Sequence, residues 1–258
     1  MADVLERILD AHRRAAAADH RPLDALVAEA ATRPAPRPFR AALEVPGLSV
    51  VAEIKRRSPS RGDLASGLVA GVLAKSYAAG GAAGLSVLTD AEFFGGSAAD
   101  LAEARAACEL PVLRKDFTVS ERDVCDARLI GADALLLIVA GLDDRELAVL
   151  HRLAEELSLA ALVEVHDERE LDRALVAGAT LVGVNQRDLR TFEVDRERAE
   201  RVRARVPAGV VTVAESGIRD GADAARLASA GYDAILVGET LVTAADPGAA
   251  LRSLVPSP

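Results

Sequence analysis

Short apolar runs recur along most of this chain, and their repetition limits the folds it can adopt. Eight runs are rich in Val, Ile and Leu and largely lack the polar alternation of half-exposed strands: LSVVAEIK, GLSVLT, LPVLRK, DALLLI, LAALVEV, TLVGVN, VVTVAES and DAILVG. Such runs are typical of parallel strands covered on both faces. Ala-rich, charge-bearing segments separate them, and several end at a glycine just before the next run, as helices do.

These units predict a (β/α)8 barrel, because eight strand–helix repeats in about 210 residues match that fold. We expect one domain over residues 1–258, since the chain is 50% hydrophobic and can bury a sizeable core. An open doubly wound sheet is the alternative. It would more often carry a GxGxxG phosphate turn after its first strand, and the sequence has none there.

Residues 1–45 do not follow the repeat. Val4, Leu5, Ile8 and Leu9 fall on one face of a helix, and LDALVAEAA gives a second helical patch. The stretch TRPAPRPF then breaks the helical pattern with three prolines. We expect a helical extension and a connector packed on the barrel.

Composition limits the classes of partner and the compartment. The formal net charge is −9 with a pI near 5.1, which argues against a broad nucleic-acid or anionic-membrane surface. No apolar run approaches the roughly 20 residues that span a bilayer. The start, MADVLERILDAHRR, has the reverse charge order of a signal peptide, and Cys108 and Cys125 have no metal-binding or redox spacing. These features predict a cytoplasmic protein.

Charged residues interrupt the apolar runs at their ends. In a barrel the carboxyl ends of the strands meet at one mouth, where the active site lies. Six ionisable side chains are therefore expected to face one cavity: Glu53, Glu164 and Glu215 against Lys55, Lys115 and Arg187. A structural ion-pair network is the alternative for any one pair. For all six it is a poor explanation, because each buried charge costs several kcal/mol unless it is well paired.

Two turns have the composition of a phosphate site. AESGIRD follows the seventh run and contains Ser216 and Gly217, and VGETLV follows the eighth and contains Gly238 and Glu239. Glycine lets the backbone approach an oxyanion, and N–H groups at a helix start can bind it. This fold often holds phosphate at the loops after strands seven and eight.

Other candidates are weaker. Glu53, Glu164 and Glu215 could hold a metal, but Lys55 and Lys115 on the same face would compete for the carboxylates. His166 could face the cavity, although HDERE also reads as a loop and helix start. Three more histidines have polar helical contexts and are expected on the surface: His12, His20 and His151. Three aromatic residues fall after the second and third runs and suggest a wall for a planar ring: Phe93, Phe94 and Phe117.

Seven motifs, in order, resemble the indole-3-glycerol-phosphate synthase family of tryptophan biosynthesis: EIKRRSPSRG, SVLTDAEFFGGS, LRKDF, LVEVHDERELDRAL, GVNQRDLRTFEVD, AESGI and ILVGETL. The resemblance implies a (β/α)8 barrel with an N-terminal helical segment over the active-site mouth. It also implies closure of a pyrrole ring in 1-(2-carboxyphenylamino)-1-deoxyribulose 5-phosphate, with loss of carbon dioxide and water. The implied partner is this phosphorylated small molecule, with no cofactor, metal, nucleic acid or membrane, and the implied state is a monomer.

The resemblance also implies catalytic roles. Lys115 matches the general acid that acts on the ribulose carbonyl, and we expect burial and like charge to lower its pKa. Glu164 matches the catalytic acid/base, and Lys55 matches the lysine that holds the anthranilate carboxylate. Glu53 and Asn185 match residues that orient these groups.

Further positions match residues that bind the substrate. Arg187 matches an arginine of the same site, and Glu215 matches a glutamate that binds the sugar part. Four positions match the phosphate loops: Ser216, Gly217, Gly238 and Glu239. The anthranilate ring would be lined by Phe94, Phe117 and Leu189. Ser58 and Ser60 would lie on the flexible first loop, a lid-like element over the cavity.

Two stretches depart from the family pattern. Gln186 stands where the family usually has asparagine, and DLASGLVAG lacks the acidic residues expected before the second helix. Neither touches the charged set, so the departures bear on loop dynamics. Other readings stay open: another phosphosugar barrel enzyme, such as an isomerase or an aldolase, or a barrel that binds a ligand without turnover.

Overall fold

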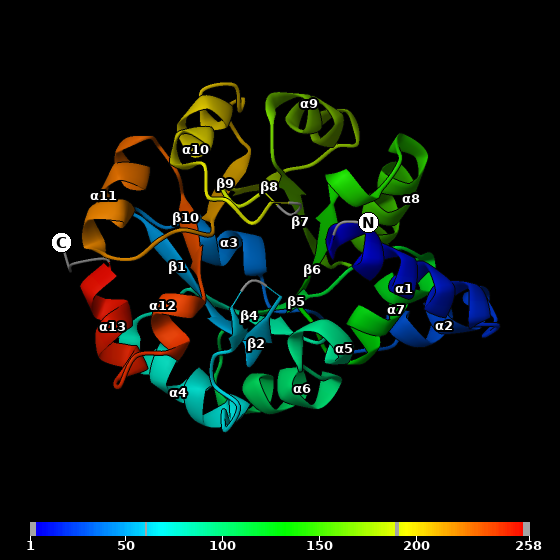
Figure 1. The fold of residues 1–258 in the computed structure, drawn as a ribbon. Helices are drawn as coiled ribbons and strands as arrows, with labels where there is room; N and C mark the ends of the chain where they lie inside the picture. Colours follow the sequence, from blue (N-terminus) through cyan, green and yellow to red (C-terminus); the bar gives the residue numbers. More distant parts are fainter. Residues whose placement is uncertain (1–3, 60, 189–190, 255–258) are drawn as a thin grey trace.

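A computed structural model describes residues 4–59, 61–188 and 191–254 of the chain. Eight parallel strands close into a barrel in the order β1-β10-β9-β8-β7-β6-β5-β4 (Figure 1). The strands are β1 (Ser49–Ile54), β4 (Gly84–Leu88), β5 (Val112–Lys115), β6 (Ala134–Ile138), β7 (Ala160–Val165), β8 (Leu181–Asn185), β9 (Val211–Glu215) and β10 (Ala234–Val237). Each coincides with one of the eight apolar runs, so the predicted (β/α)8 barrel is confirmed.

Helices surround the barrel as an outer ring (Figure 1). They are α4 (Ala70–Gly80), α5 (Ala91–Phe94), α6 (Ala98–Ala107), α7 (Glu121–Leu129), α8 (Asp144–Glu156), α9 (Glu168–Val176), α10 (Arg196–Arg203), α11 (Gly221–Ser229), α12 (Glu239–Val242) and α13 (Pro247–Leu254), with a 3-10 turn η1 (Val139–Gly141). Side chains fix several helix starts. In α7, Ser120 and Asp123 form a reciprocal capping box, which satisfies backbone N–H groups that have no partner within the helix.

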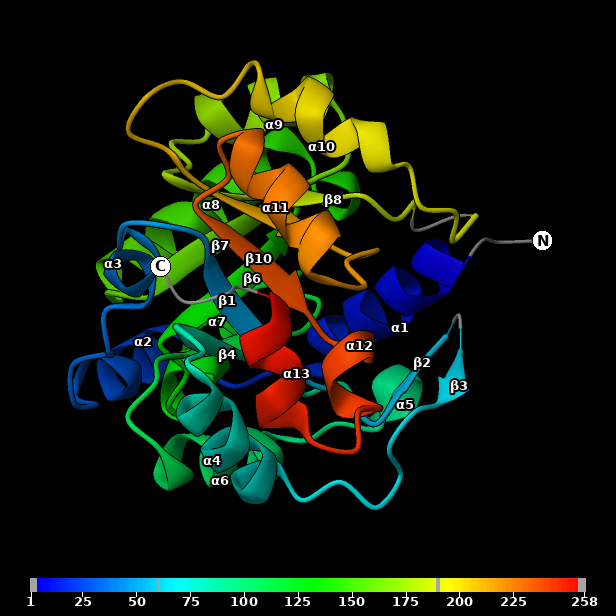
Figure 2. The ribbon, with the colours of Figure 1, turned by 90° about the vertical axis from the view of Figure 1, so that its left-hand side faces the viewer.

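A two-stranded hairpin, β2 (Arg57–Ser58) and β3 (Gly62–Asp63), follows β1. The sequence indicated only a flexible loop here. Figure 2 shows the hairpin at the same end of the barrel as α1 (Val4–Ala18), which is the end where the strands terminate. Arg57–Ser58 and Gly62–Asp63 therefore lie over the mouth as a pair of short strands.

The hydrophobic core has two layers. One cluster fills the barrel interior and includes Val51, Leu113, Leu162 and Val213. The other lies between the strands and the helix ring, where residues of the opposite strand face, such as Ala52 and Ile54, pack. Residues two apart in a strand share a face, so each strand contributes side chains to both layers of the core. This is why the runs lack polar alternation.

The N-terminal extension divides between the two ends of the barrel. Helix α1 lies over the mouth, as expected, and α2 (Leu23–Ala31) packs against α7 on the side. Helix α3 (Phe39–Leu43) lies at the opposite end, and Figure 1 shows it through the barrel centre. Phe39 and Leu43 are buried in the barrel-interior cluster. The third helix therefore closes the floor of the barrel and does not cover the mouth.

Candidate active site

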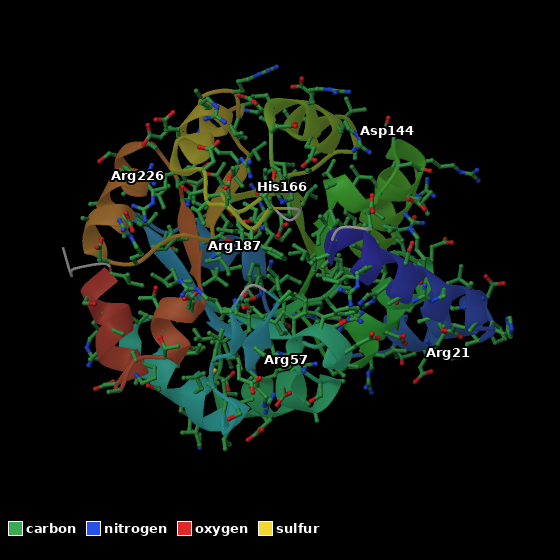
Figure 3. All side chains as sticks on the ribbon, in the orientation of Figure 1. Arg21, Arg57, Asp144, His166, Arg187 and Arg226 are labelled. Carbon is green, nitrogen blue, oxygen red and sulfur yellow. The ribbon has the colours of Figure 1, made fainter. Side chains whose placement is uncertain are left out.

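A cavity of about 390 Å³ opens at the carboxyl ends of the strands. All six ionisable residues that interrupt the runs line it, together with Asn185 and the turns after β9 and β10. Strand register brings them together, because Leu88 pairs with Lys115, Ile138 with Glu164, and Asn185 with Glu215. In Figure 3, viewed down the barrel, Arg187 lies near the central axis, whereas Arg21 of the N-terminal extension and Asp144 of α8 lie at the periphery.

Lys115 is the centre of the charged set. Its Nζ lies 3.1 Å from Glu164 Oε2 and 3.2 Å from Glu215 Oε2. Both carboxylates are almost fully buried, and Asn185 Nδ2 donates to the other oxygen of Glu164 at 3.1 Å. One ammonium thus faces two carboxylates, and the three groups together carry a net charge of −1 when both carboxylates are ionised.

The pKa of Lys115 is raised, and the expected lowering is wrong. Burial alone would lower it, but the charges of Glu164, Glu215 and Glu53 outweigh burial. The sequence indicated that the glutamates share a cavity with Lys115, but not that Glu164 and Glu215 lie within ion-pairing distance of its ammonium. Lys115 therefore carries its proton firmly in the free protein.

The three glutamates of the cavity have different pKa values. For Glu53 and Glu164 burial would raise the pKa, but neighbouring lysines lower it on balance, helped at Glu164 by His166 and Asn185. Burial raises the pKa of Glu215 to about 7, with the charges of Glu164 and Glu53 adding to it against Lys115. One oxygen of Glu215 is buried without a hydrogen-bond partner. Glu215 can therefore hold a proton near neutral pH, while Glu164 stays ionised.

Lys55 forms a second ion pair at the mouth. Its Nζ lies 2.5 Å from Glu53 Oε1, and Ser86 Oγ donates to the other oxygen of Glu53 at 3.4 Å.

Two glycines leave space for the carboxylates of Glu53 and Glu215. A Cβ at Gly238 would lie 2.3 Å from Glu53 Oε1, and a Cβ at Gly183 would lie 2.2 Å from Glu215 Oε1. Gly238 thus leaves room for the Glu53 side chain as well as for any phosphate. Gly183, which leaves room for Glu215, was not a candidate from the sequence.

The turn after β9 has a strained backbone. Ser216 adopts a φ of 66° and Gly217 a φ of 72°, both in the left-handed region. A non-glycine residue there is uncommon and marks sites where the surroundings hold the chain. Gln186 supplies such a restraint, since its Nε2 donates to the Ser216 carbonyl at 2.8 Å. Gln186 therefore holds this turn in place.

The turn after β10 meets the first loop. Glu239 begins α12, and its Oε1 lies 3.1 Å from a guanidinium nitrogen of Arg61. Both residues line the cavity. Arg187, on the β8 side, donates to the Phe192 carbonyl at 2.9 Å and lines the cavity as well. In this part of the cavity, the two arginines carry more positive charge than Glu239 alone can balance.

Apolar side chains line another part of the cavity. The rings of Phe94 and Phe117 lie 6.4 Å apart at a 33° tilt. Further apolar residues that the sequence did not indicate as a wall also line the cavity, among them Val4, Leu5, Ile8 and Phe192. The helical stripe of α1 was visible in the sequence, but its partner surface was not. Phe93 does not line the cavity, Ser58 does, and Ser60 and Leu189 lie outside the described residues.

The histidines differ from expectation. His151 is buried, and burial lowers its pKa, so its surface assignment is wrong. His12 is half-buried between α1 and the barrel, whereas His20 is exposed as expected. His166 lies 3.5 Å from Glu164 but pairs more closely with Glu170 at 3.0 Å, and it does not line the cavity.

A family model for indole-3-glycerol phosphate synthase matches residues 5–254. A relative from Streptomyces coelicolor, "Indole-3-glycerol phosphate synthase 2", is 55% identical over 226 residues and covers 88% of each chain. An "Indole-3-glycerol phosphate synthase" from Mycobacteroides abscessus is 50% identical over 98% of this chain and 93% of its own.

The chain belongs to the indole-3-glycerol phosphate synthase family.

Solved structures outside the family share the fold alone. A thiamine phosphate pyrophosphorylase from Pyrococcus furiosus is 18% identical with a TM-score of 0.61, covering 84% of this chain and 95% of that one. A 3-hexulose-6-phosphate synthase has the same identity and TM-score, covering 80% and 98%. Membership of the synthase family therefore rests on the sequence relatives. None of the helices in the described part of the chain has the length and hydrophobicity to cross a membrane.

Proposed function

We propose that this chain catalyses the family reaction in its own cavity, with Lys115 and Glu164 as the acid and base. The reaction closes the pyrrole ring of 1-(2-carboxyphenylamino)-1-deoxyribulose 5-phosphate and releases carbon dioxide and water. The observation that carries the assignment of roles is the Lys115 ammonium, which lies between Glu164 and Glu215 at the cavity wall.

The cavity has a place for each part of this substrate. Phe94, Phe117 and the apolar face of α1 suit the aromatic ring. The turns at Ser216–Gly217 and Gly238–Glu239 suit the phosphate, with Arg61 and Arg187 supplying positive charge nearby. Lys55 then lies at the mouth between them and suits the carboxylate of the ring. These binding roles stay proposals.

In the first step a ring carbon forms a bond to the ribulose carbonyl carbon. The carbonyl oxygen becomes an alkoxide, which is more basic than an ammonium and takes a proton from Lys115. A raised pKa does not prevent this transfer, because the ammonium first stabilises the growing negative charge in a water-poor site. Loss of carbon dioxide leaves its bonding electrons in the ring and restores aromaticity.

In the second step the new hydroxyl leaves as water. A protonated group must donate to the leaving oxygen, while a base removes a proton so that the second double bond forms. Glu164 is the base in this proposal, since its pKa is lowered on balance and Asn185 orients it. Glu215, with a pKa raised by burial to about 7, can return a proton to Lys115 over 3.2 Å.

The other enzyme readings fit the geometry less well. An aldolase needs a neutral lysine to form a Schiff base, and the raised pKa of Lys115 keeps it protonated. The isomerase would use a cysteine and an aspartate at strand ends, but Cys125 is buried in α7 on the helix ring.

We further propose that the protein is a cytoplasmic monomer that acts on a phosphorylated small molecule.

Turnover of the ribulose substrate tests this proposal, because the indole product fluoresces and the substrate does not in the same window. The wild-type protein is expected to form indole-3-glycerol phosphate and one equivalent of carbon dioxide. Glu164→Gln keeps the shape of the side chain and removes the base, so kcat should fall about 10²–10⁴-fold. Binding of the substrate without product in the wild-type protein would contradict the proposal.

A further inference from the structure

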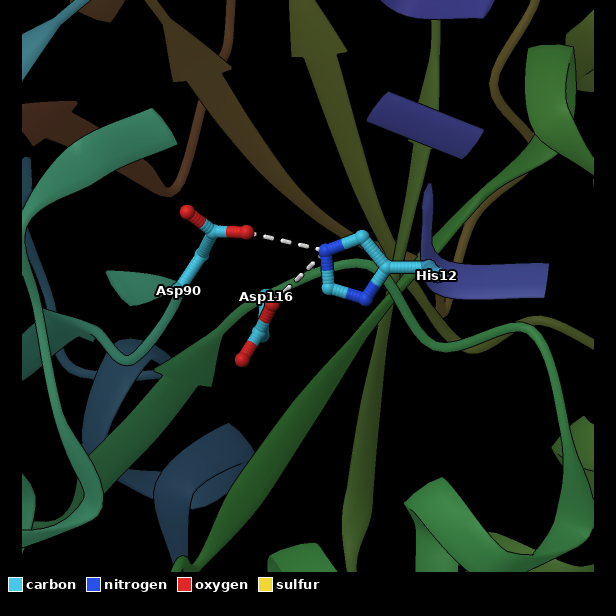
Figure 4. A group of neighbouring side chains, drawn as sticks. All are labelled: His12, Asp90 and Asp116. Carbon is cyan, nitrogen blue, oxygen red and sulfur yellow. Dashed lines mark hydrogen bonds and ion pairs between the residues drawn. The ribbon is translucent and has the colours of Figure 1, made fainter. Parts of the chain in front are cut away.

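His12 on α1 contacts two buried aspartates at the barrel mouth (Figure 4). Its Nε2 lies 2.9 Å from Asp90 Oδ2 and 3.8 Å from Asp116 Oδ1. The side chains of both aspartates are 5% exposed and that of His12 is 18% exposed. The ring of His12 also lies 5.4 Å from the ring of Phe117. One side chain of the N-terminal helix therefore contacts residues that follow two barrel strands.

Both aspartates are tied to the aromatic part of the cavity. The other oxygen of Asp90 accepts hydrogen bonds from the backbone N–H groups of Phe93 and Phe94, at 2.5 and 3.1 Å, and so caps α5. Asp116 accepts from the N–H of Phe117 at 2.9 Å. Phe94 and Phe117 line the cavity, as do Leu5 and Ile8, one to two turns before His12 on α1. The His12 contact thus joins the wall that α1 forms to the wall that the barrel loops form.

We propose that His12 is a positioning residue that holds α1 against the barrel through Asp90 and Asp116 and thereby keeps the aryl end of the substrate pocket closed. The proposal rests on the proposed function for the identity of the substrate. His12 does not line the cavity and acts through Leu5 and Ile8.

The charges around His12 favour its protonated form. Burial alone would lower the pKa of His12, but the hydrogen bond to Asp90 and the charges of Asp116, Asp90 and Asp123 raise it on balance. Asp123 lies on α7, and Arg114, 3.1 Å from Asp116, offsets part of the Asp116 charge. On α1 itself, Arg13 forms an ion pair with Glu146 of α8, with 2.7 Å between Nη1 and Oε1. Since the raised pKa belongs to a cationic group, the docking energy is fully present below about pH 6.5 and declines as the pH rises through the raised value.

A metal ion is a poorer occupant of this cluster. Asp116 already accepts from Thr89, Arg114 and the Phe117 N–H, and Asp90 already accepts from two N–H groups. Protonated His12 supplies the positive charge that the pair of aspartates lacks. The cluster is therefore complete with the residues that the chain provides.

The kinetic test compares His12→Ala, His12→Lys and the exposed control His20→Ala with the wild-type protein at about pH 6 and about pH 8.5. At the lower pH, His12→Ala should raise KM about tenfold with kcat changed by less than about threefold, since a charge-assisted contact of this kind is worth about one factor of ten. The ratio of variant to wild-type KM should approach one at the higher pH. His12→Lys, which stays charged, should keep KM low at both pH values, and His20→Ala should match the wild type.

A second measurement does not depend on catalysis. Amide hydrogen-exchange protection of residues 5–16, corrected for the intrinsic effect of pH, should fall in His12→Ala at about pH 6, and NMR should give a His12 pKa above 6.5. Unchanged protection, a His12 pKa at or below 6.5, or a KM ratio that is flat with pH would overturn the proposal. So would a melting temperature that rises on adding Zn²⁺ in the wild type but not in His12→Ala. If no synthase activity is found, the exchange and NMR results still decide whether His12 docks α1.

Discussion

Lys115 is expected to stabilise its surroundings as well as to take part in the proposed reaction. Three carboxylates are within its electrostatic reach, and two of them are ion-paired with it. From sequence alone a catalytic lysine is expected to be replaceable with little loss of stability, because functional charges are often poorly compensated. The structure gives the opposite expectation here, since Lys115 is the compensating charge for its neighbours.

Lys115→Ala is expected to lower both activity and stability. kcat should fall at least 10²–10⁴-fold, because the acid and the charge near the alkoxide are lost together. Unfolding free energy should fall by about 3–5 kcal/mol near pH 8, where the carboxylates are left buried without a partner. The loss should shrink toward pH 5 as those carboxyl groups take up protons.

Lys115→Arg is the matched control for that pair of effects. Arginine keeps the positive charge, so melting temperature should stay close to that of the wild type, but it does not release a proton at neutral pH and should leave kcat low. Thermal melts and turnover of both variants at two pH values give the answer. An arginine variant with full kcat would show that Lys115 serves only as an ion-pair partner.

Glu215 should make the protein less stable as pH rises through neutrality. Its pKa is raised by burial to about 7 in the folded protein, so between about pH 4.5 and pH 7 the folded state binds more protons than the unfolded state. By linkage, stability then falls with rising pH over this window. Glu215→Gln removes that titration, and its melting temperature relative to wild type should climb from pH 5 to pH 8. A difference that stays constant across this range would contradict the raised pKa.

At the scale of elements, the N-terminal helices have separate tasks. Helix α1 contributes Leu5 and Ile8 to the mouth, whereas α3 contributes Phe39 and Leu43 to the floor. An interpretation from sequence that treats residues 1–45 as one cover over the mouth misses this division. The proline-rich connector allows it, because it crosses the outside of the barrel with its arginines bound to carbonyl groups, as Arg37 is to Cys108 and Leu110.

Deleting residues 1–18 should separate folding from activity. The barrel and its floor remain, so a cooperative thermal transition is expected, while KM rises strongly because the aryl wall is missing. Deleting residues 1–43 also removes α3 and should abolish the cooperative transition, since the barrel interior is left open to water. Circular dichroism melts and steady-state kinetics of the two truncated proteins make the comparison. Full activity of the shorter deletion would rule out α1 as a wall of the pocket.

At the scale of the whole molecule, the barrel has an apolar end and an end that carries the charged cavity. The charged residues cluster where the strands terminate, and the opposite end is closed by apolar packing on Phe39, which is 1% exposed. One ring carbon of Phe39 lies 3.2 Å from where a Cβ on Gly84 would stand, so this glycine at the start of β4 accommodates the ring. Barrel enzymes commonly divide their ends in this way.

Phe39→Ala should therefore cost stability without a change in chemistry. A buried phenylalanine replaced by alanine typically loses about 3–5 kcal/mol. kcat per folded molecule should stay within about twofold at low temperature, because the floor lies at the end away from the charged set. The exposed Val45→Ala is the control and should shift stability by less than about 0.5 kcal/mol. Urea unfolding and kinetics below the unfolding transition test both variants. A large fall in kcat for Phe39→Ala would show that the two ends of the barrel are energetically coupled, against this expectation.

The amino-acid sequence by itself determined the barrel, its eight strands and the set of residues at the mouth. Apolar runs of strand length and glycine-ended helices act locally, and parallel strands in a closed sheet bring their carboxyl ends together whatever the details of packing. For this reason the sequence alone predicts one cavity that holds five of the charged residues: Glu53, Lys55, Lys115, Glu164 and Glu215.

Only the tertiary structure decided the pKa values, the division of the N-terminal helices and the contact of His12 with Asp90 and Asp116. Each depends on distances between residues far apart in the chain, such as the 3.1 Å from Lys115 to Glu164 and the 2.9 Å from His12 to Asp90. Electrostatic energy changes steeply over a few ångströms and with burial, so the sign of the Lys115 shift could not follow from spacing in the sequence. Periodicity indicated which face of α1 is apolar, and packing alone set which end of the barrel that face covers.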